Sequence, residues 1–388
     1  MNFQVRQIQS HGDLRDFIRL PWKIYSDIPQ WVPPLLSSEE KALSPKSGAF
    51  FQNGEAALFL VYKGKTPVGR ISAHVNHQYE RFRNQDTGFF GFFECIEDVD
   101  AAKALIAAAE RWLRDRGKKR MLGPMSFGLY DISGILVDGF NDPPVIMTAY
   151  SPPYYRKLVE ESGLAKASDW YAFLVHRNVV VPPSLYRIRD RLVRQQKIEF
   201  ETLDMKQLDR AVELIGQIFA DAWMENWEHV PFTDAELDHL LKELKPVVVP
   251  ELTYLAFHNG RCIGFSLNIK DANPALQKAN GRLFPVGLVK MIREMSKITR
   301  LRTIAMGVIK EYRHRGIDLV FYLNTIERGR ELGFLDSECS LIVESNEPMI
   351  RALEDLDAQR YKTFRFYEKT IDQNSEPVKN ETKCSDGQ

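Results

Sequence analysis

The stretch "GVIKEYRHRGIDLVFYL", Gly307 to Leu323, is the most informative segment for predicting the fold of this 388-residue chain. It begins as an apolar strand, passes through an Arg-His-Arg cluster, turns at Gly316 and continues as an apolar helical run. Backbone N–H groups at a helix start have no intrahelical partners, and the helix dipole adds partial positive charge there. The turn therefore suits a bound anion such as a diphosphate. A solvated basic loop before an ordinary helix is the alternative.

Individual residues of this turn favour the anion site without deciding it. Gly316 permits a left-handed backbone or the close approach of a ligand. Arg313 and Arg315 can pair with phosphate oxygens through two N–H groups each. Asp318 is a common acid of a first helical turn, and its charge would oppose a phosphate. From the residues alone, both interpretations stay open.

A repeat with one fixed offset divides the chain around this stretch. "FLVYKGKTPVGRISA" (Phe59–Ala73) aligns with "YLAFHNGRCIGFSLN" (Tyr254–Asn268), and both have the pattern of a β-hairpin. "PYYRKLVEESGL" (Pro153–Leu164) aligns with "PMIRALEDLDAQ" (Pro348–Gln359), and both read as helices opened by proline. The differences 254 − 59 and 348 − 153 are both 195. The shared offset indicates a duplication, with chance agreement of common patterns as the alternative.

The duplication predicts two domains, at residues 1–178 and 198–370, joined by a linker helix at 179–197 and followed by a disordered polar tail at 371–388. The second domain mixes strands and helices, which predicts an α/β fold with a mixed central sheet. Its expected elements are strand 198–202, helices 206–223 and 233–244, hairpin 252–268, helix 286–296, strand 302–309, helix 318–333, strand 335–344, helix 347–356 and strand 361–369.

Composition argues against two classes of protein, nucleic-acid-binding proteins and membrane-spanning proteins. Lys+Arg and Asp+Glu are both 52, so no global basic field attracts nucleic acid. No segment approaches the roughly 18 apolar residues of a membrane span, and the start lacks a secretory pattern. We expect a cytoplasmic protein, with a peripheral contact to the inner membrane left open. The cysteines match no metal spacing, which predicts reduced thiols and no metal site; they are Cys95, Cys262, Cys339 and Cys384.

The run from Arg313 to Asp318 resembles the acetyl-CoA-binding motif Gln/Arg-x-x-Gly-x-Gly/Ala of the GCN5-related N-acetyltransferase (GNAT) superfamily. Arg313 and Gly316 match, whereas Asp318 stands where the family usually has a small residue. The following helix "ESNEPMIRALEDL" and the aromatic strand ending in "YEK" also resemble the closing elements of that fold. The resemblance implies that the second domain binds acetyl-CoA or a longer acyl-CoA. The implied binding residues are Val308, Ile309, Tyr312, Arg313, His314, Arg315, Gly316, Ile317, Asp318 and Asn346.

The first domain resembles a second GNAT fold with an altered phosphate loop. Its strand–helix junction has no Arg-x-x-Gly and carries Glu94, Glu97, Asp98 and Asp100 instead. Acids there would repel a diphosphate, so we expect no CoA binding of this kind in the first domain. The irregular stretch Gly123–Pro144 reads as a long loop, and long ordered loops are often functional.

Three further stretches resemble a group of bacterial tandem GNAT proteins related to bacterial ceramide synthases. They are "IPQWVPPL" (Ile28–Leu35), the loop from Gly123, and "NGRLFPVGLVK" (Asn280–Lys290). This resemblance implies an N-acyltransferase of the EC 2.3.1 type that moves an acyl group from CoA to an amine. It also suggests a lipid amine, such as a long-chain sphingoid base, as the acceptor.

Amine acylation needs a proton acceptor, a donor to the carbonyl oxygen and an acid for the leaving thiolate. Glu344, at a strand end, is a candidate base acting through a water, or simply a solvated acid. Tyr367 lies where the family often has a tyrosine acid, or it is an aromatic packing residue. The segment "DAWMENWEHVPFTDAE" is a candidate acceptor wall through Trp223, Glu225, Trp227 and His229, although a loop histidine is commonly structural.

Two other interpretations stay open. One is a catalytically inactive GNAT fold that senses acyl-CoA or binds a partner protein. The other is nucleic-acid binding through the basic stretch "YRIRDRLVRQQK" (Tyr186–Lys197), against which the neutral net charge counts. We therefore expect no nucleic-acid partner, and the oligomeric state is not predicted.

Overall fold

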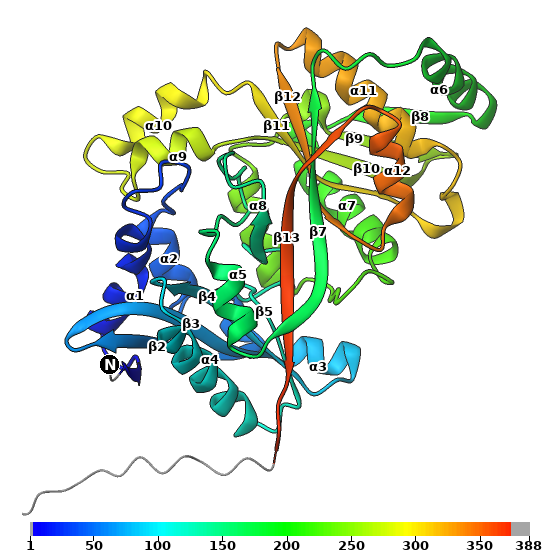
Figure 1. The fold of residues 1–388 in the computed structure, drawn as a ribbon. Coiled ribbons are helices and arrows are strands. Elements are labelled where there is room, and N and C mark those ends of the chain that lie inside the picture. Colours follow the sequence, from blue (N-terminus) through cyan, green and yellow to red (C-terminus); the bar gives the residue numbers. More distant parts are fainter. Residues whose placement is uncertain (1–2, 374–388) are drawn as a thin grey trace, which may run out of the picture.

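A computed structural model describes residues 3–373, which build one continuous sheet of thirteen strands with helices on its faces (Figure 1). Most of the predicted tail, from residue 374, lies outside the described residues. Ile371 is buried, and its amide donates a hydrogen bond to the Lys119 carbonyl at 2.8 Å. The ordered chain therefore runs past 371, and the predicted start of the tail was wrong.

Seven strands and five helices lie in the described part of the N-terminal half. In chain order they are β1 (Phe3–Gln7), α1 (His11–Ile24), α2 (Leu36–Ala42), β2 (Gly54–Lys63), β3 (Thr66–Asn76), α3 (His77–Arg83), β4 (Thr87–Cys95), α4 (Val99–Arg114), β5 (Arg120–Gly123), β6 (Ile135–Asp138), α5 (Tyr155–Glu161) and β7 (Ala165–His176).

Helix α6 (Pro183–Gln196) links this half to the second, where the predicted α/β element order is confirmed. The elements are β8 (Ile198–Thr202), α7 (Leu208–Ala222), α8 (Asp234–Leu244), β9 (Tyr254–His258), β10 (Arg261–Lys270), α9 (Asn273–Ala279), α10 (Gly287–Met295), β11 (Arg300–Val308), α11 (Ile317–Glu331), β12 (Asp336–Val343), α12 (Glu347–Glu354) and β13 (Gln359–Thr370). The short helix α9, opened by Pro274, was missed because it has too few residues to show a period.

The last strand of each repeat completes the sheet of the other repeat. Strand β13 pairs antiparallel with β5 of the N-terminal half, and β7 pairs antiparallel with β12 of the C-terminal half. The two exchanged strands also pair with each other, and they run side by side through the middle of the molecule (Figure 1). The sheet order is therefore β1-β2-β3-β4-β5-β13-β7-β12-β11-β10-β9-β8, with β6 also on β13.

Each half packs helices on its part of the sheet around a separate apolar core. Helix α4 buries seven side chains, Leu105 and Leu113 among them, against β2 and β3. Helices α7 and α11 cover the C-terminal part, where Phe321 and Phe265 are fully buried. Each such side chain contributes about 1.5–3 kcal/mol by leaving water. Cys95, Cys262 and Cys339 are buried free thiols, as predicted, and burial raises the pKa of each; Cys384 lies outside the described chain.

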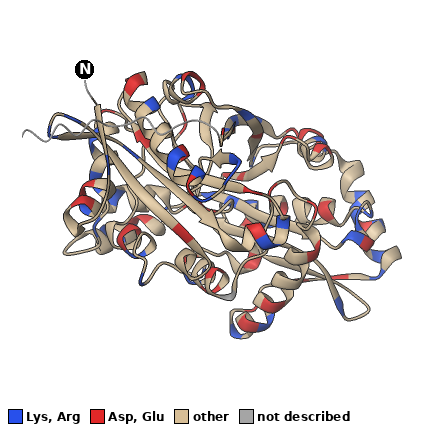
Figure 2. Ribbon diagram, turned by 90° about the horizontal axis from the view of Figure 1, so that it is seen from below, with Lys and Arg blue, Asp and Glu red and all other residues tan. Residues whose placement is uncertain are grey.

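Charged residues are distributed over the whole surface. Figure 2 shows Lys and Arg interspersed with Asp and Glu along the visible helices. In the basic helix α6, Arg189 pairs with Asp190 and with Glu327 of α11, so part of its charge is neutralised within the fold. Between residues 3 and 373, no helix has both the length and the apolar content to cross a membrane.

Candidate active site

The loop between β11 and α11 has the backbone that the sequence predicted. Gly316 is the residue before the helix, and its φ of 77° confirms the left-handed backbone that the sequence permits there. His314 is also left-handed, with φ of 61°. Among residues 3–373, no side chain caps α11, so the N–H groups of its first turn are left for another acceptor.

Arg313 is held at the edge of this loop by the end of α7. Its Nη2 donates to the Ala222 carbonyl at 2.9 Å, and its Nη1 lies 3.7 Å from a Glu225 carboxylate oxygen. Lys310 binds the same carboxylate at 2.8 Å and holds the pKa of Glu225 below its usual range. A guanidinium has five N–H donors, so these contacts orient Arg313 and leave donors for a ligand.

Arg315 and Ile309 do not face the same space as Arg313. Arg315 lies over the Tyr312 ring, 4.6 Å from its centroid, on the side of α6 and β8. The Ile309 amide donates to the Ile263 carbonyl at 3.0 Å, so it is used within the fold. Neither residue lines the cavity that Arg313 borders, and their contact with a ligand stays a prediction.

Strands β11 and β12 pair as parallel neighbours only at their first residues. Their register runs from Arg300 opposite Asp336 to Thr303 opposite Cys339. Within the described chain that pairing stops there, while β11 continues to pair with β10 up to Val308. A bulge between Leu267 and Asn268 of β10 accompanies the change of direction. The two strands therefore diverge beyond Thr303 and Cys339.

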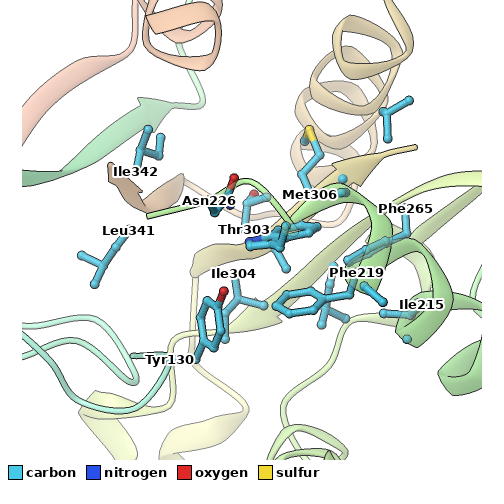
Figure 3. A pocket seen from close by; sticks show the side chains of 18 of the residues that line it. Tyr130, Ile215, Phe219, Asn226, Phe265, Thr303, Ile304, Met306, Leu341 and Ile342 are labelled. Carbon is cyan, nitrogen blue, oxygen red and sulfur yellow. The ribbon is translucent and has the colours of Figure 1, made fainter. Parts of the chain in front are cut away.

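A cavity of 740 Å³ fills the space between the diverging strands. It extends from the start of α11 past α7 and α8 to a loop of the N-terminal half. Figure 3 shows Ile304 and Met306 of β11 on one side and Leu341 and Ile342 of β12 on the other. Its size lies within the about 300–1,000 Å³ typical of small-molecule sites. The lining is mainly aliphatic and aromatic, so the cavity suits an apolar group.

Most of the predicted ligand residues line this cavity. They are Val308, Tyr312, Arg313, His314, Ile317, Asp318 and Asn346 of the predicted acyl-CoA set, and Trp223, Glu225 and Trp227 of the predicted acceptor wall. Asn346 accepts a hydrogen bond from the Met349 amide at 3.4 Å and so caps α12. Gly316 does not line the cavity, and its contribution is the turn that places its neighbours.

The two predicted catalytic side chains lie elsewhere. Tyr367 is fully buried in the core of the N-terminal half, where its hydroxyl donates to Glu160 at 3.3 Å. It is displaced from the cavity because β13 crosses into the other half. Glu344 points away from the cavity, pairs with Lys166 at 2.7 Å and accepts from the Asp169 amide at 3.1 Å. Neither side chain lines the cavity.

His229 lies behind the cavity wall. Its Nδ1 is 2.5 Å from the hydroxyl of Tyr130, and burial lowers the pKa of this histidine to about 4. The chain reverses at Glu228, which has φ of 52° and pairs with Arg120 at 2.8 Å. His229 is therefore a neutral support for Tyr130 and does not itself line the cavity.

The N-terminal half supplies cavity residues for which no motif was visible. Tyr130 points into the space beside Ile304 (Figure 3), and Asp131 follows it. Asp131 accepts from the Gly128 amide at 2.9 Å. The Asp131 residue is exposed to solvent, although many protein atoms lie around its carboxylate. This enclosure, with the nearby acids Glu236 and Glu243, raises the pKa of Asp131 to about 7. Only the irregular composition of the Gly123 loop pointed to this region.

The point where β11 and β12 separate is fixed by a buried arginine. Arg302 donates to the Ser340 hydroxyl at 3.1 Å, to the Ser340 carbonyl at 3.2 Å and to the Ile146 carbonyl at 2.5 Å. Ser340 in turn donates to the buried Glu338. Full burial lowers the pKa of Arg302. These bonds tie both strands and the N-terminal half together at one end of the cavity.

Comparison with known proteins places the chain in a family, although no family model matches it. Bacterial ceramide synthase of Caulobacter vibrioides (strain NA1000 / CB15N) is 32% identical over 384 residues, which cover 95% of this chain and 98% of that protein. Protein YghO of Escherichia coli (strain K12) is 32% identical over 375 residues, with 95% of each chain covered. The chain belongs to the tandem GNAT family of bacterial ceramide synthase. It is an N-acyltransferase of this family.

Solved structures show the same tandem GNAT fold. A tandem GNAT protein from the clavulanic acid biosynthesis pathway superposes with a TM-score of 0.55 at 11% identity and covers 96% of this chain and 99% of its own. A GCN5-related N-acetyltransferase from Sphaerobacter thermophilus superposes with a TM-score of 0.51 at 15% identity, covering 95% and 96%. At this identity the similarity establishes the fold alone.

The N-terminal GNAT half differs from the C-terminal one at two places, the start of α4 and the space beside β4. Asp98 caps α4 by accepting from the amides of Asp100 and Ala101 at 3.0 and 3.3 Å. The space beside β4 is filled by backbone, since a Cβ on Gly91 would lie 1.7 Å from the Met125 carbonyl oxygen. These features support the prediction that this half of the N-acyltransferase does not take CoA in the usual way.

The described residues also lack a cluster of metal ligands. Among them, no group of three or more His, Cys, Asp or Glu is arranged to hold an ion.

Proposed function

We propose that this N-acyltransferase transfers an acyl group from acyl-CoA to a lipid amine, such as a long-chain sphingoid base. The observation that carries the proposal is the apolar cavity between β11 and β12, which joins the open start of α11 to the loop of Tyr130 and Asp131. A site for small polar amines alone would not need so long an apolar wall. The name of the ceramide synthase relative supports the same class of acceptor.

The donor end of the cavity is formed by Arg313, His314 and the first turn of α11. Uncapped N–H groups, the helix dipole and a guanidinium together favour a diphosphate. These residues fit the diphosphate of CoA, whose thioester would supply the activated acyl carbon. Asp318 of the same turn is exposed and adds negative charge, so we expect weaker binding than a small residue would allow.

The acceptor end is formed by Tyr130 and Asp131. In amide formation the amine nitrogen bonds to the thioester carbonyl carbon, the C–S bond breaks, the nitrogen loses a proton and the sulfur gains one. Asp131 is the cavity carboxylate with a raised pKa, near the value at which a group exchanges protons at neutral pH. We assign it as the proton acceptor and binder of the ammonium form, in place of Glu344.

Isothermal titration of the purified protein with acetyl-CoA and palmitoyl-CoA tests the donor site. The proposal predicts binding of both, with tighter binding of palmitoyl-CoA, and a loss of about tenfold or more in Arg313→Ala. Arg351→Ala is the matched control, because Arg351 is exposed and pairs with Glu347 on its own helix, away from the cavity lining. Absence of binding to either thioester would contradict the proposal.

A catalytically inactive acyl-CoA sensor remains the second candidate. Asp318 favours it, since this residue departs from the family motif at the phosphate loop. Binding of acyl-CoA without amide formation on the long-chain amines tested would favour the sensor over acylation of a lipid amine.

A further inference from the structure

Several of the exposed apolar side chains in the described chain lie together on one short segment. Phe284, Val286, Val289 and Ile292 are 76%, 56%, 68% and 62% exposed, and together they form what we call the α10 face. All four lie on α10 or within three residues of its start. Single exposed apolar residues are common on protein surfaces, but a group of this kind marks a binding surface.

Cations surround the α10 face. Between residues 278 and 297 the chain carries Lys278, Arg282, Lys290, Arg293 and Lys297. The one acid of that segment, Glu294, is paired with Lys297 at 3.0 Å. On a helix with 3.6 residues per turn, residues four apart are neighbours. Lys290 lies four residues after Val286, and Arg293 lies four residues after Val289. The face is therefore both apolar and positively charged.

The segment is firmly attached to the rest of the protein. Asn280 accepts from the indole of Trp22 at 3.1 Å, Gln277 donates to the Pro29 carbonyl at 2.8 Å, and the Gly281 carbonyl accepts from the Leu36 amide at 3.0 Å. Figure 1 shows α9 and α10 at the edge of the molecule. The α10 face is thus presented by a fixed support and is not an unpacked segment.

We propose that the α10 face docks on the surface of an anionic lipid bilayer. Apolar side chains enter the boundary between headgroups and acyl chains, while Lys and Arg extend beside them to the phosphates. A protein partner is disfavoured, because lysines are depleted from the centres of protein interfaces. Negative charge on the partner is required by the excess of cations on the segment.

Docking would bring the membrane close to the cavity. Met295, at the end of α10, packs in the same cluster as Met147, Leu240 and Ile304, which line the cavity wall. A lipid substrate would then reach the enzyme from the bilayer. This last point rests on the proposed function, whereas the docking itself does not.

Sedimentation of the full-length protein with vesicles tests the docking without any substrate. Vesicles of phosphatidylcholine alone are compared with vesicles of phosphatidylcholine and phosphatidylglycerol, at low and high salt. We expect binding only to the anionic vesicles, weakened by salt. The double variant Lys290→Gln and Arg293→Gln should bind anionic vesicles about 30-fold more weakly. The double variant Val289→Ser and Ile292→Ser should bind them at least tenfold more weakly.

Val180→Ser is the matched control, since Val180 is 84% exposed but lies between β7 and α6. It should bind vesicles as the wild type does. The docking would be overturned if the wild type failed to bind anionic vesicles. It would also be overturned if both double variants bound these vesicles as tightly as the wild type does. A wild-type dimer that the double variant Val289→Ser and Ile292→Ser no longer forms would also overturn the docking, because the α10 face would then join two copies of the chain. Acyl-CoA binding measured in solution is a separate result, so failure of the docking leaves the proposed function standing.

Discussion

Tyr367 of β13 lies opposite Gly123 of β5, although the two residues belong to different repeats. The pairing places the C-terminal strand in the core of the N-terminal half, and β7 makes the reciprocal exchange beside β12. The two repeats are therefore one folding unit, joined by backbone hydrogen bonds in the centre of the sheet.

The first prediction follows from this exchange. Residues 1–178 expressed alone should not unfold cooperatively, because they leave β5 without its β13 neighbour and β7 without β12. Co-expression with residues 179–388 should restore a soluble complex with one thermal transition. A folded, monomeric fragment 1–178 with the thermal stability of the full chain would contradict the prediction.

The second prediction concerns the turn before α11. Gly316→Ala forces a side chain into a left-handed backbone at a cost of about 1–2 kcal/mol, and its Cβ would lie 2.6 Å from Leu192 Cδ1. We expect acyl-CoA binding to weaken by about tenfold as the turn shifts. The control is Gly333→Ala, at φ of 86° after the end of the same helix with no atom within 4 Å of the added Cβ. It should lose similar stability and keep full affinity, and equal loss of affinity in both would argue against a phosphate site.

The third prediction separates the catalytic candidates. Asp131→Asn should lower the rate of amide formation by about 100-fold or more, the usual contribution of a proton acceptor. Tyr367→Phe and Glu344→Gln should stay close to the wild-type rate, because neither side chain lines the cavity. Circular dichroism would confirm that all three variants are folded. A large loss in Tyr367→Phe with Asp131→Asn unaffected would make Tyr367 the catalytic group instead.

The fourth prediction is the pH dependence of that reaction. Because the pKa of Asp131 is raised to about 7, the carboxylate form is present above that value. The rate with a long-chain amine should rise as pH increases through about 7, and this limb should be absent from the residual activity of Asp131→Asn. The same limb in the variant would assign the titration to another group.

The fifth prediction concerns stability in acid. His74 is enclosed by Phe50, Phe89 and Phe127, and burial lowers its pKa from 6.5 to about 3. Below pH 6.5 the unfolded chain binds a proton that the folded chain does not, so stability is lost as the pH falls from 6.5 toward 3. The slope from this group approaches about 1.4 kcal/mol per pH unit. Denaturant unfolding of His74→Leu should show a shallower loss between these limits than the wild type, and an equal loss in both would contradict the prediction.

Local pattern was enough to predict the element order, the left-handed Gly316 and the altered junction at Asp98. These features depend on residues close together in the chain. The position of Tyr367 was not predictable in this way, because its strand has the same pattern whichever neighbour it pairs with. Asp131 and Arg302 belong to no motif, and their place at the cavity arises only when the two halves meet. The cavity itself results from the divergence of β11 from β12, which no single segment encodes.

Amide formation from a long-chain acyl-CoA and a long-chain amine is the reaction that the proposed site must perform. The decisive experiment is mass spectrometry of the products formed by the purified full-length protein, with wild type, Asp131→Asn and Arg313→Ala run together. We predict an N-acylated lipid and one equivalent of free CoA thiol with the wild type, and strongly reduced amounts with both variants. Acyl-CoA binding with no amide product from the wild type, or product formation that neither variant reduces, would contradict the proposed function.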